Sequence, residues 1–317
     1  MLQKDKTSNY LIIGNGSIAE RHIKIIKKYD SFSKIYVFIR TKNIPINNSR
    51  KITYIKSFNK KFCEEIDYFY ICTPTSSHKY YLFKFLKYKK SKIFLEKPLN
   101  ISSFSKNEIN NLIPDQNRIH IGYNMRFMNI IQYFKKNIIS KNIFLIKVDT
   151  SNNLKYWRKT NYKKSVTANK NKGGGIILEL SHELDYLYSI FKSLEIKYSF
   201  NKKLSNLKIN VEDILHLHLI NKNKTNIILN MNMFSSLEER TLKVFSEDKV
   251  YFLDLIKNKI LIYSNRYKLI KKLSFKNDLR DSYIRQFNNF RYGKHTNFER
   301  CRIIDANKIL QTIEILR

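Results

Sequence analysis

The chain up to Gly122 alternates short apolar runs with segments whose apolar residues recur at helical spacing. The apolar runs predict five strands, at Tyr10–Ile13, Lys34–Ile39, Tyr68–Cys72, Lys92–Leu95 and Ile119–Gly122. The segment Ser17–Tyr29 places Ile18, His22, Ile25 and Ile26 near one stripe, which predicts a helix. Because strands that alternate with helices form right-handed βαβ units, this half predicts a parallel, doubly wound sheet.

After Gly122 the pattern changes to successive strand-like runs with turn-like breaks, which favours an open, mostly antiparallel sheet. These runs are Lys141–Val148, Ile196–Phe200, Asp213–Leu219, Asn226–Met233, Thr241–Phe245, Lys249–Leu255 and Lys259–Ser264, and helices are predicted at Gly175–Phe191, Asp281–Arg291 and Glu299–Leu316. We therefore expect a dinucleotide-binding Rossmann domain at 1–122 and an α+β domain for substrate binding and oligomerisation at 123–317. The C-terminal helix is free to pack back on the first domain.

The length and composition support two folded domains. With 317 residues, 43% of them apolar and 14% aromatic, the chain can bury a core, which excludes wholesale disorder. It has no apolar run long enough to cross a membrane, and its polar start lacks the apolar stretch of a signal peptide. Cys63, Cys72 and Cys301 fit neither a disulfide framework nor a zinc site and suit a reducing cytoplasm. We expect a cytoplasmic protein without a metal site.

The chain is strongly basic, with 60 Lys and Arg against 26 Asp and Glu, for a net charge of +34. The basic residues occur in every segment and accompany abundant Asn and Ile, a joint bias that an A+T-rich genome imposes on any protein. The alternative is a partner that is a nucleic acid or another polyanion, but the sequence has neither a helix-turn-helix pattern nor a concentrated basic stripe. We expect no nucleic-acid or membrane partner, although a positive field would favour an acidic substrate.

A glycine motif, Gly14-Asn-Gly16-Ser-Ile-Ala19, follows the first strand and opens the first helix. Gly14 permits a tight turn, and Gly16 lets the backbone approach a pyrophosphate. The helix N-terminus then offers free N–H groups and a favourable dipole to the phosphates. We expect Gly14, Gly16, Ser17 and Ile18 to bind a dinucleotide; the alternative is an ordinary tight turn.

The end of the second strand predicts which cofactor is used. The sequence there is Arg40-Thr41-Lys42, and no Asp or Glu follows until Glu64. An acidic residue would bind a ribose 2′-hydroxyl and select NAD. Arg40 and Thr41 offer donors to a 2′-phosphate instead, so NADP is predicted over NAD. The alternatives are that these are ordinary surface residues, or that Arg40 stacks on adenine in either cofactor.

Two further turns follow strands, Cys72-Thr-Pro-Thr-Ser-Ser-His78 and Phe94-Leu-Glu-Lys-Pro-Leu99. The carboxyl ends of parallel strands border the crevice in which open α/β sheets bind ligands. Lys97, held between a strand and Pro98, would project into this crevice. The alternative is a surface ion pair between Glu96 and Lys97.

In the second half, a helix is predicted after Gly173-Gly-Gly175, with Glu179 and Asp185 three residues before and after His182. All three side chains would lie near one stripe, where a carboxylate can orient the imidazole for acid–base chemistry. The alternative is a half-buried histidine without a catalytic role. His216 and His218 alternate along a predicted strand, which indicates a structural pair on one face.

Together these motifs resemble the Gfo/Idh/MocA family of oxidoreductases over nearly the whole chain. The motifs are, in order, Gly14-Asn-Gly16, Thr73-Pro74 with His78, Glu96-Lys97-Pro98, Gly122-Tyr-Asn-Met-Arg126-Phe, Trp157-Arg158 and Gly173-Gly-Gly…His182…Asp185. The resemblance implies an N-terminal Rossmann domain and a C-terminal α/β domain with an open sheet. It also implies hydride transfer between a nicotinamide cofactor and a sugar, a cyclitol or a related compound.

The resemblance also implies roles for individual residues. Lys97 matches the catalytic lysine, His182 matches the catalytic or substrate-binding histidine, and Glu96 would seat the nicotinamide end. The remaining matches are Thr73, Pro74, His78 and Arg126 for the cofactor and Trp157, Arg158, Glu179 and Asp185 for the substrate. Many members place an acid four residues before the histidine, where this chain has Leu178. Whether Glu179 replaces that acid stays open.

The sequence therefore predicts an NAD(P)-dependent enzyme that oxidises or reduces a sugar or nucleotide-sugar. The segment from Leu178 to Tyr186 is similar to a branch of the family associated with surface-glycan sugars. We expect a homodimer or homotetramer. The alternative is a non-catalytic dinucleotide-binding regulator or a nucleic-acid-binding protein, which would keep Gly14 and Gly16 but need neither Lys97 nor His182.

Overall fold

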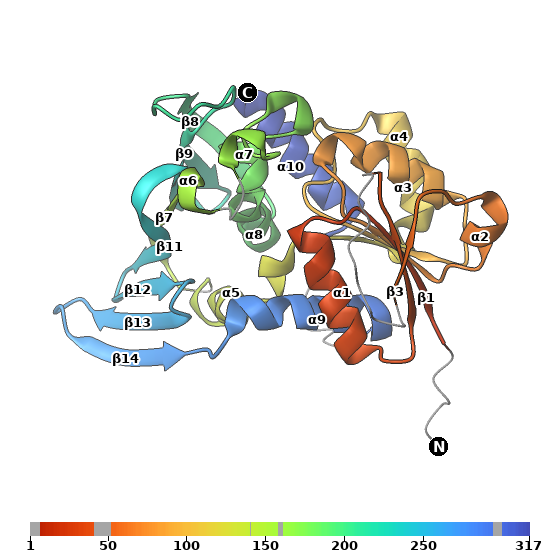
Figure 1. Cartoon of the computed structure of the whole chain (residues 1–317). Helices are drawn as coiled ribbons and strands as arrows, with labels where there is room; N and C mark the ends of the chain where they lie inside the picture. Colours follow the sequence, from red (N-terminus) through yellow and green to blue (C-terminus); the bar gives the residue numbers. More distant parts are fainter. Residues whose placement is uncertain (1–6, 41–51, 140, 158–160, 294–299) are drawn as a thin grey trace, which may run out of the picture.

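The computed structural model describes residues 7–40, 52–139, 141–157, 161–293 and 300–317. Its strands form two separate sheets, and several helices lie between them (Figure 1). No helix in the described part of the chain is long and apolar enough to cross a membrane.

The first sheet has six strands in the order β3-β2-β1-β4-β5-β6, and all its neighbouring strands are parallel. The strands are β1 (Asn9–Ile13), β2 (Lys34–Phe38), β3 (Ile52–Ile55), β4 (Tyr68–Ile71), β5 (Lys92–Leu95) and β6 (Ile119–Ile121), and the helices among them are α1 (Ser17–Tyr29), α2 (Lys60–Glu64), α3 (His78–Leu86) and α4 (Lys106–Leu112). This arrangement confirms the predicted Rossmann domain. The strands are mostly apolar because helices cover both faces of the sheet.

One of the covering helices comes from the far end of the chain. Phe287 and Phe290 of α9 (Asp278–Tyr292) pack in the same cluster as Tyr10 of β1 and Ile26 of α1. Arg291, in the last turn of α9, donates from Nε to Oδ2 of Asp30 at 2.9 Å. The first sheet is thus completed by residues that follow the second sheet in the sequence.

The second sheet has eight strands in the order β14-β13-β12-β11-β7-β10-β9-β8. Its strands are β7 (Ile143–Asn153), β8 (Leu194–Lys202), β9 (Ile214–Asn221), β10 (Asn226–Asn232), β11 (Phe234–Ser246), β12 (Lys249–Asp254), β13 (Lys259–Ser264) and β14 (Leu269–Ser274). Only β7 and β10 pair in parallel, which confirms the mostly antiparallel sheet.

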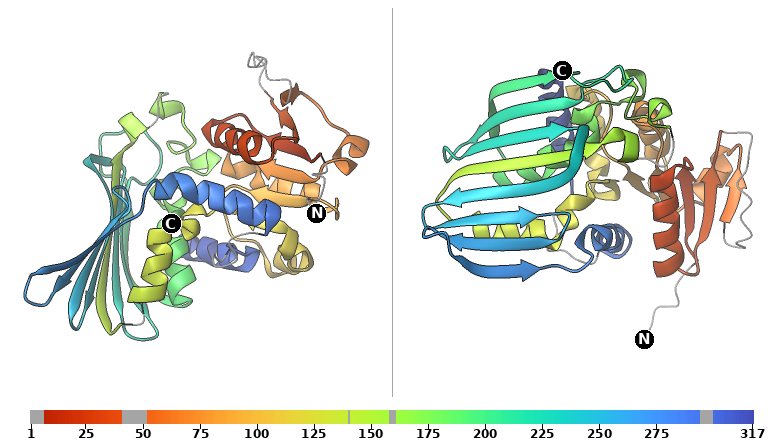
Figure 2. Two further views of the ribbon diagram at one scale, coloured as in Figure 1. Left: turned by 90° about the horizontal axis from the view of Figure 1, so that it is seen from below. Right: turned by 60° about the vertical axis from the view of Figure 1, so that its left-hand side comes forward.

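The two faces of this sheet differ. In β9, Leu215, Leu217 and Leu219 are fully buried on the helix side. His216 and His218 alternate with them on the outer face and contact Asn230 and Asn226 of β10, which confirms the predicted structural pair. Figure 2 shows this outer face without a covering helix.

The remaining helices are α5 (Asn129–Tyr133), α6 (Leu154–Trp157), α7 (Ile176–Glu179), α8 (Ser181–Phe191) and α10 (Ile303–Leu316), with 3₁₀ turns at Thr75–Ser77, Ile113–Arg118, Asn124–Phe127, Tyr162–Lys164 and Lys170–Lys172 and a π turn at Phe134–Ile138. The bounds predicted for α1 are those observed. The single helix predicted at Gly175–Phe191 is wrong, because the chain leaves helical geometry at Leu180 and begins α8 at Ser181. The short edge strands β3 and β14 were not predicted.

Candidate active site

The turn after β1 has the geometry of a phosphate cradle. Gly14 has a φ of +110°, and a Cβ there would lie 2.5 Å from the carbonyl oxygen of Cys72, so a larger residue would not fit. At Gly16, which precedes α1, a Cβ would meet no atom within 4 Å. The turn therefore leaves open space beside the first N–H groups of α1, and Ser17 and Ile18 begin that helix. These features fit the pyrophosphate of a dinucleotide.

The turn after β4 is joined to the turn after β5 by His78. The ring of His78 is buried, with Nδ1 2.8 Å from the carbonyl oxygen of Pro98 and Nε2 3.0 Å from that of Thr73. Burial lowers the pKa of His78, against the opposing effect of these carbonyl groups. Pro74 is exposed, and the buried Oγ1 of Thr73 has no hydrogen-bond partner among the described residues. His78 therefore sets the positions of both turns, and its own ring is enclosed.

Glu96 is held by His22, which the sequence did not mark as a site residue. Nε2 of His22 in α1 lies 2.6 Å from Oε1 of Glu96, and both side chains are buried. A Cβ at Gly122 would lie 3.0 Å from Oε2 of Glu96, so Gly122 leaves the room that this carboxylate occupies. The sequence did contain a signal for this contact. His22 lies within the apolar stripe of α1, and a buried histidine needs a polar partner.

Lys97 reaches from the end of β5 to the second half of the chain. Its Nζ donates to the carbonyl oxygen of Glu179 at 2.6 Å and lies 3.9 Å from the Oε1 carboxylate atom. Both side chains are 16% exposed. Thr167 donates from Oγ1 to Oε2 of Glu179 at 3.1 Å and so fixes the other carboxylate oxygen. The partly exposed lysine and glutamate and the buried threonine form one polar cluster.

The glycine cluster brings this region against the first domain. Gly173 has a φ of +83°, and a Cβ there would lie 2.8 Å from Cβ of Thr75 in the turn after β4. The chain then enters α7, which ends at Glu179. Because of the break at Leu180, Glu179 does not continue the helical stripe of His182. Leu178, the residue at the family's usual acid position, is fully buried.

His182 lies in the first turn of α8 with its ring edge-on to Tyr123, at 5.6 Å between centroids. Burial, followed by the charges of Lys97 and Arg240, lowers the pKa of His182 well below its ordinary value. The imidazole is therefore neutral at neutral pH. Its buried Nδ1 has no hydrogen-bond partner among the described residues, so no flanking carboxylate orients the ring through this nitrogen.

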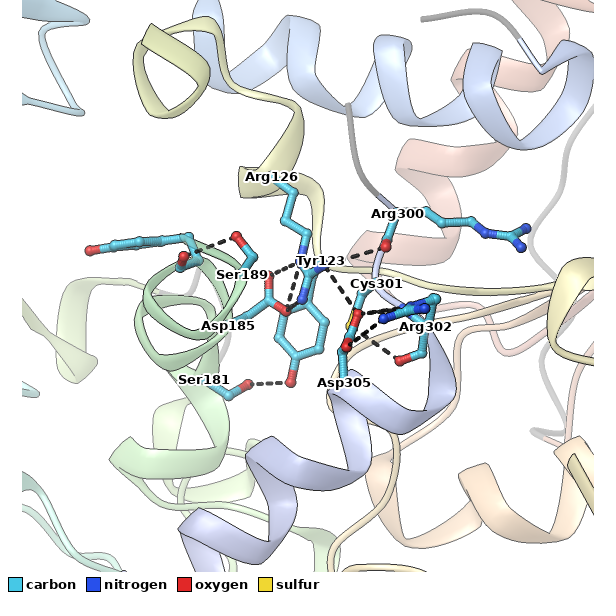
Figure 3. Close-up of polar contacts among 10 residues, drawn as sticks. Tyr123, Arg126, Ser181, Asp185, Ser189, Arg300, Cys301, Arg302 and Asp305 are labelled. Atoms are coloured by element: carbon cyan, nitrogen blue, oxygen red, sulfur yellow. Dashed lines mark hydrogen bonds and ion pairs between the residues drawn. The ribbon is translucent and has the colours of Figure 1, made fainter. Parts of the chain in front are cut away.

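Asp185 is instead bound to Arg126. The guanidinium of Arg126 donates from Nη2 to Oδ1 of Asp185 at 2.7 Å and from Nε to Oδ2 at 2.9 Å (Figure 3). The two side chains are 2% and 0% exposed. Burial alone would lower the pKa of Arg126, but the charge of Asp185 raises it. A cofactor role for Arg126 and a substrate role for Asp185 remain predictions. In this structure the guanidinium and the carboxylate bind each other.

The other expected site residues are dispersed or lie outside the described residues. Trp157 ends α6 and packs partly buried against the large core. Arg40 is exposed just beyond β2, whose Phe38 carbonyl accepts from the Gly14 N–H at 3.1 Å. Arg158 and Thr41 lie outside the described residues. Within the described ranges, no group of three or more His, Cys, Asp or Glu side chains could hold a metal ion.

The fold and the glycine turn are those of a dinucleotide-binding domain, and residues 8–123 match the Gfo/Idh/MocA model, described as an oxidoreductase family with an NAD-binding Rossmann fold. The first domain of the chain is thus similar to the NAD-binding Rossmann domain of the Gfo/Idh/MocA family. No curated protein sequence matches the chain significantly.

Solved structures match the chain over both domains. UDP-N-acetylglucosamine 3-dehydrogenase GnnA from Acidithiobacillus ferrooxidans is 16% identical with a TM-score of 0.71, covering 98% of this chain and 97% of that one. The WlbA dehydrogenase from Bordetella pertussis, in complex with NADH and UDP-GlcNAcA, is 13% identical with a TM-score of 0.69, covering 98% and 95%. A super-repressor mutant of Gal80p from Saccharomyces cerevisiae is 14% identical with a TM-score of 0.76, also covering 98% and 95%. At these identities the matches establish a shared two-domain fold.

Proposed function

We propose that this protein is a nicotinamide-dependent oxidoreductase that transfers hydride to or from a hydroxyl or carbonyl carbon of a nucleotide-sugar. The observation that carries the proposal is the contact between Lys97 and Glu179, formed where the turn after β5 meets α7. The charge of Lys97 also acts on His182 in the first turn of α8. The UDP-sugars named for the GnnA and WlbA structures support the substrate class. A role in surface-glycan sugar synthesis is part of the same proposal.

In this function the substrate lies between the first domain and the open sheet. When bound, the nicotinamide supplies or accepts the hydride. Lys97 donates a proton to the substrate oxygen during reduction and receives it during oxidation. The carboxylate of Glu179, fixed by Thr167, keeps the ammonium group aimed at that oxygen, and neutral His182 offers a ring nitrogen to a neighbouring hydroxyl.

The direct test is turnover by the purified protein. UDP-N-acetylglucosamine, UDP-N-acetylglucosaminuronic acid and UDP-glucose would each be assayed with NAD and NADP, following nicotinamide absorbance. Turnover of a UDP-sugar is expected. Cofactor binding without turnover of any sugar would favour a non-catalytic regulator, the alternative that similarity to Gal80p keeps in view.

NADP is the cofactor that we propose, on the exposed position of Arg40 beyond β2 and beside the Gly14 turn. A guanidinium there can bind a 2′-phosphate with a charge-assisted fork. The dissociation constants of NADP and NAD would be measured for wild type and Arg40→Ala. We expect the wild type to prefer NADP and the variant to lose that preference. A wild type that prefers NAD contradicts the proposal.

A homodimer or homotetramer is proposed from the uncovered outer face of the open sheet, which carries half-exposed aromatic side chains such as Tyr198. Light scattering after size-exclusion chromatography measures the assembly. A monomer at micromolar concentration would contradict it.

A further inference from the structure

Arg240 is a charged residue of β11 that precedes two apolar residues on one face of the strand. Leu242 and Val244 are fully buried on the face that the helices cover. Because side chains alternate along a strand, Arg240 is the next residue on that same face. The Arg240 side chain is 20% exposed, so solvent can reach it.

Arg240 is held in place by a buried carboxylate. Its Nε lies 2.9 Å from Oε1 of Glu183, which is fully buried in α8 and follows His182 in the sequence. Thr150 of β7 donates to the same oxygen at 3.2 Å. This contact uses one of the five N–H donors of the guanidinium. Glu183 therefore fixes the direction of Arg240, and the donors that remain can bind another group.

Two cations thus act on His182. Lys97 approaches from the first sheet and contacts Glu179, and Arg240 approaches from the second sheet and contacts Glu183. The charges of both act on the ring of His182, since each lowers its pKa after the effect of burial. A neutral sugar needs only one of these cations, the one at the reacting oxygen.

We propose that Arg240 binds a negatively charged group of the substrate beside the reacting carbon. The inference rests on the proposed function and assigns one residue of the second sheet to an anionic group of that substrate. Arginine presents a planar fork that matches carboxylate and phosphate oxygens. A carboxylate on the sugar ring and the phosphate on its anomeric carbon share this chemistry. The opposing interpretation is an ion pair with Glu183 that only stabilises the fold.

The test measures binding of three probes by calorimetry, with cofactor present, so that it does not depend on turnover. The probes are UDP-N-acetylglucosaminuronic acid, UDP-N-acetylglucosamine and N-acetylglucosamine. For Arg240→Met we expect affinity for the anionic probes to fall about tenfold or more, the range for a hydrogen bond to a charged group. Arg240→Lys should restore part of it. A loss confined to the uronic acid identifies the carboxylate, and an equal loss for both UDP-sugars identifies the phosphate.

A second variant separates binding from folding. Arg240→Met leaves the Glu183 carboxylate buried and unpaired, whereas Glu183→Gln with Arg240→Met removes both charges. The double variant should recover thermal stability but not affinity for the anionic probes. Recovery of affinity, an unchanged affinity in the single variant, or failure of the wild type to bind either UDP-sugar overturns the proposal. If the wild type binds these probes but turns none over, the proposed enzymatic function fails while the Arg240 site stands.

Discussion

Two carboxylates, one before and one after His182 in the sequence, contact cations that differ greatly in burial. Before the histidine, Glu179 meets Lys97 at 3.9 Å, with both side chains 16% exposed. After it, Asp185 forms a two-point ion pair with Arg126, with both side chains almost completely buried. A partly exposed cation that makes no close contact with its carboxylate partner can exchange that partner for a substrate, whereas a sealed pair cannot do so without leaving a buried charge. Burial therefore separates a pair suited to chemistry from one suited to holding the fold.

The comparison predicts the largest loss of activity at Lys97. Lys97→Met should lower kcat by about 10²- to 10⁴-fold, because a positioned proton donor contributes that much to rate. Cofactor affinity and the thermal midpoint should change little. Steady-state kinetics, cofactor titration and thermal unfolding measure the three quantities, with Lys271→Met, an exposed lysine of β14, as the matched control. A near-normal kcat would remove Lys97 from the mechanism.

Arg126→Met should act on stability first. Removing one partner of a buried pair costs about 3–5 kcal/mol of unfolding free energy, since Asp185 is left without its counter-ion. Denaturant unfolding of the wild type, Arg126→Met and Arg126→Met with Asp185→Asn measures this cost, and the double variant should recover part of it. If the single variant kept full stability but lost cofactor affinity, the predicted cofactor role would replace the structural one.

Glu179→Gln should have a smaller effect on rate. The amide keeps the shape and the contact with Thr167 but removes the negative charge beside Lys97. We expect kcat to fall about tenfold, which corresponds to the free energy of one hydrogen bond to a charged group. The pH profile of kcat should shift, and the unfolding free energy should change little. An unchanged pH profile would contradict a part for Glu179 in the proton path.

Histidines can be compared in the same way. His120 stacks on Phe94 inside an aromatic cluster, where burial lowers its pKa to about 3, whereas His182 adjoins Lys97 and Arg240. The unfolded chain binds a proton on His120 below its ordinary pKa of 6.5, but the folded chain does not. Stability from this ring is therefore complete above pH 6.5 and declines by about 1.4 kcal/mol per pH unit as the pH falls towards 3.

Replacing His120 by Phe tests the direction of this pH dependence. His120→Phe should reduce the acid sensitivity of the unfolding free energy between pH 6.5 and pH 4 and leave kcat unchanged. Denaturant midpoints across this range measure the slope. An equal slope in variant and wild type would place the acid sensitivity in other groups, such as the buried His78.

Strand and helix patterns alone were enough for most of the fold. Apolar runs and the helical stripe gave α1 and five of the six strands in the first sheet, because burial on both faces makes those segments apolar. The edge strand β14 was missed because most of its side chains are exposed and the alternation is lost. β3, at the other edge, was missed because none of its four residues is fully buried. Where packing is one-sided or weak, the sequence carries little periodicity to detect.

The sequence by itself determined the residue types of the site, namely the two-glycine turn, Lys97 after a strand, and His182 among acids. Only the tertiary structure decided which charges meet. Lys97 and Glu179 are 82 residues apart, His22 and Glu96 are 74 apart, and Arg126 and Asp185 are 59 apart. The break at Leu180 also separates Glu179 from the stripe that a continuous helix would give it. Periodicity reports local burial, whereas an ion pair depends on where two distant elements pack, and no local pattern encodes that.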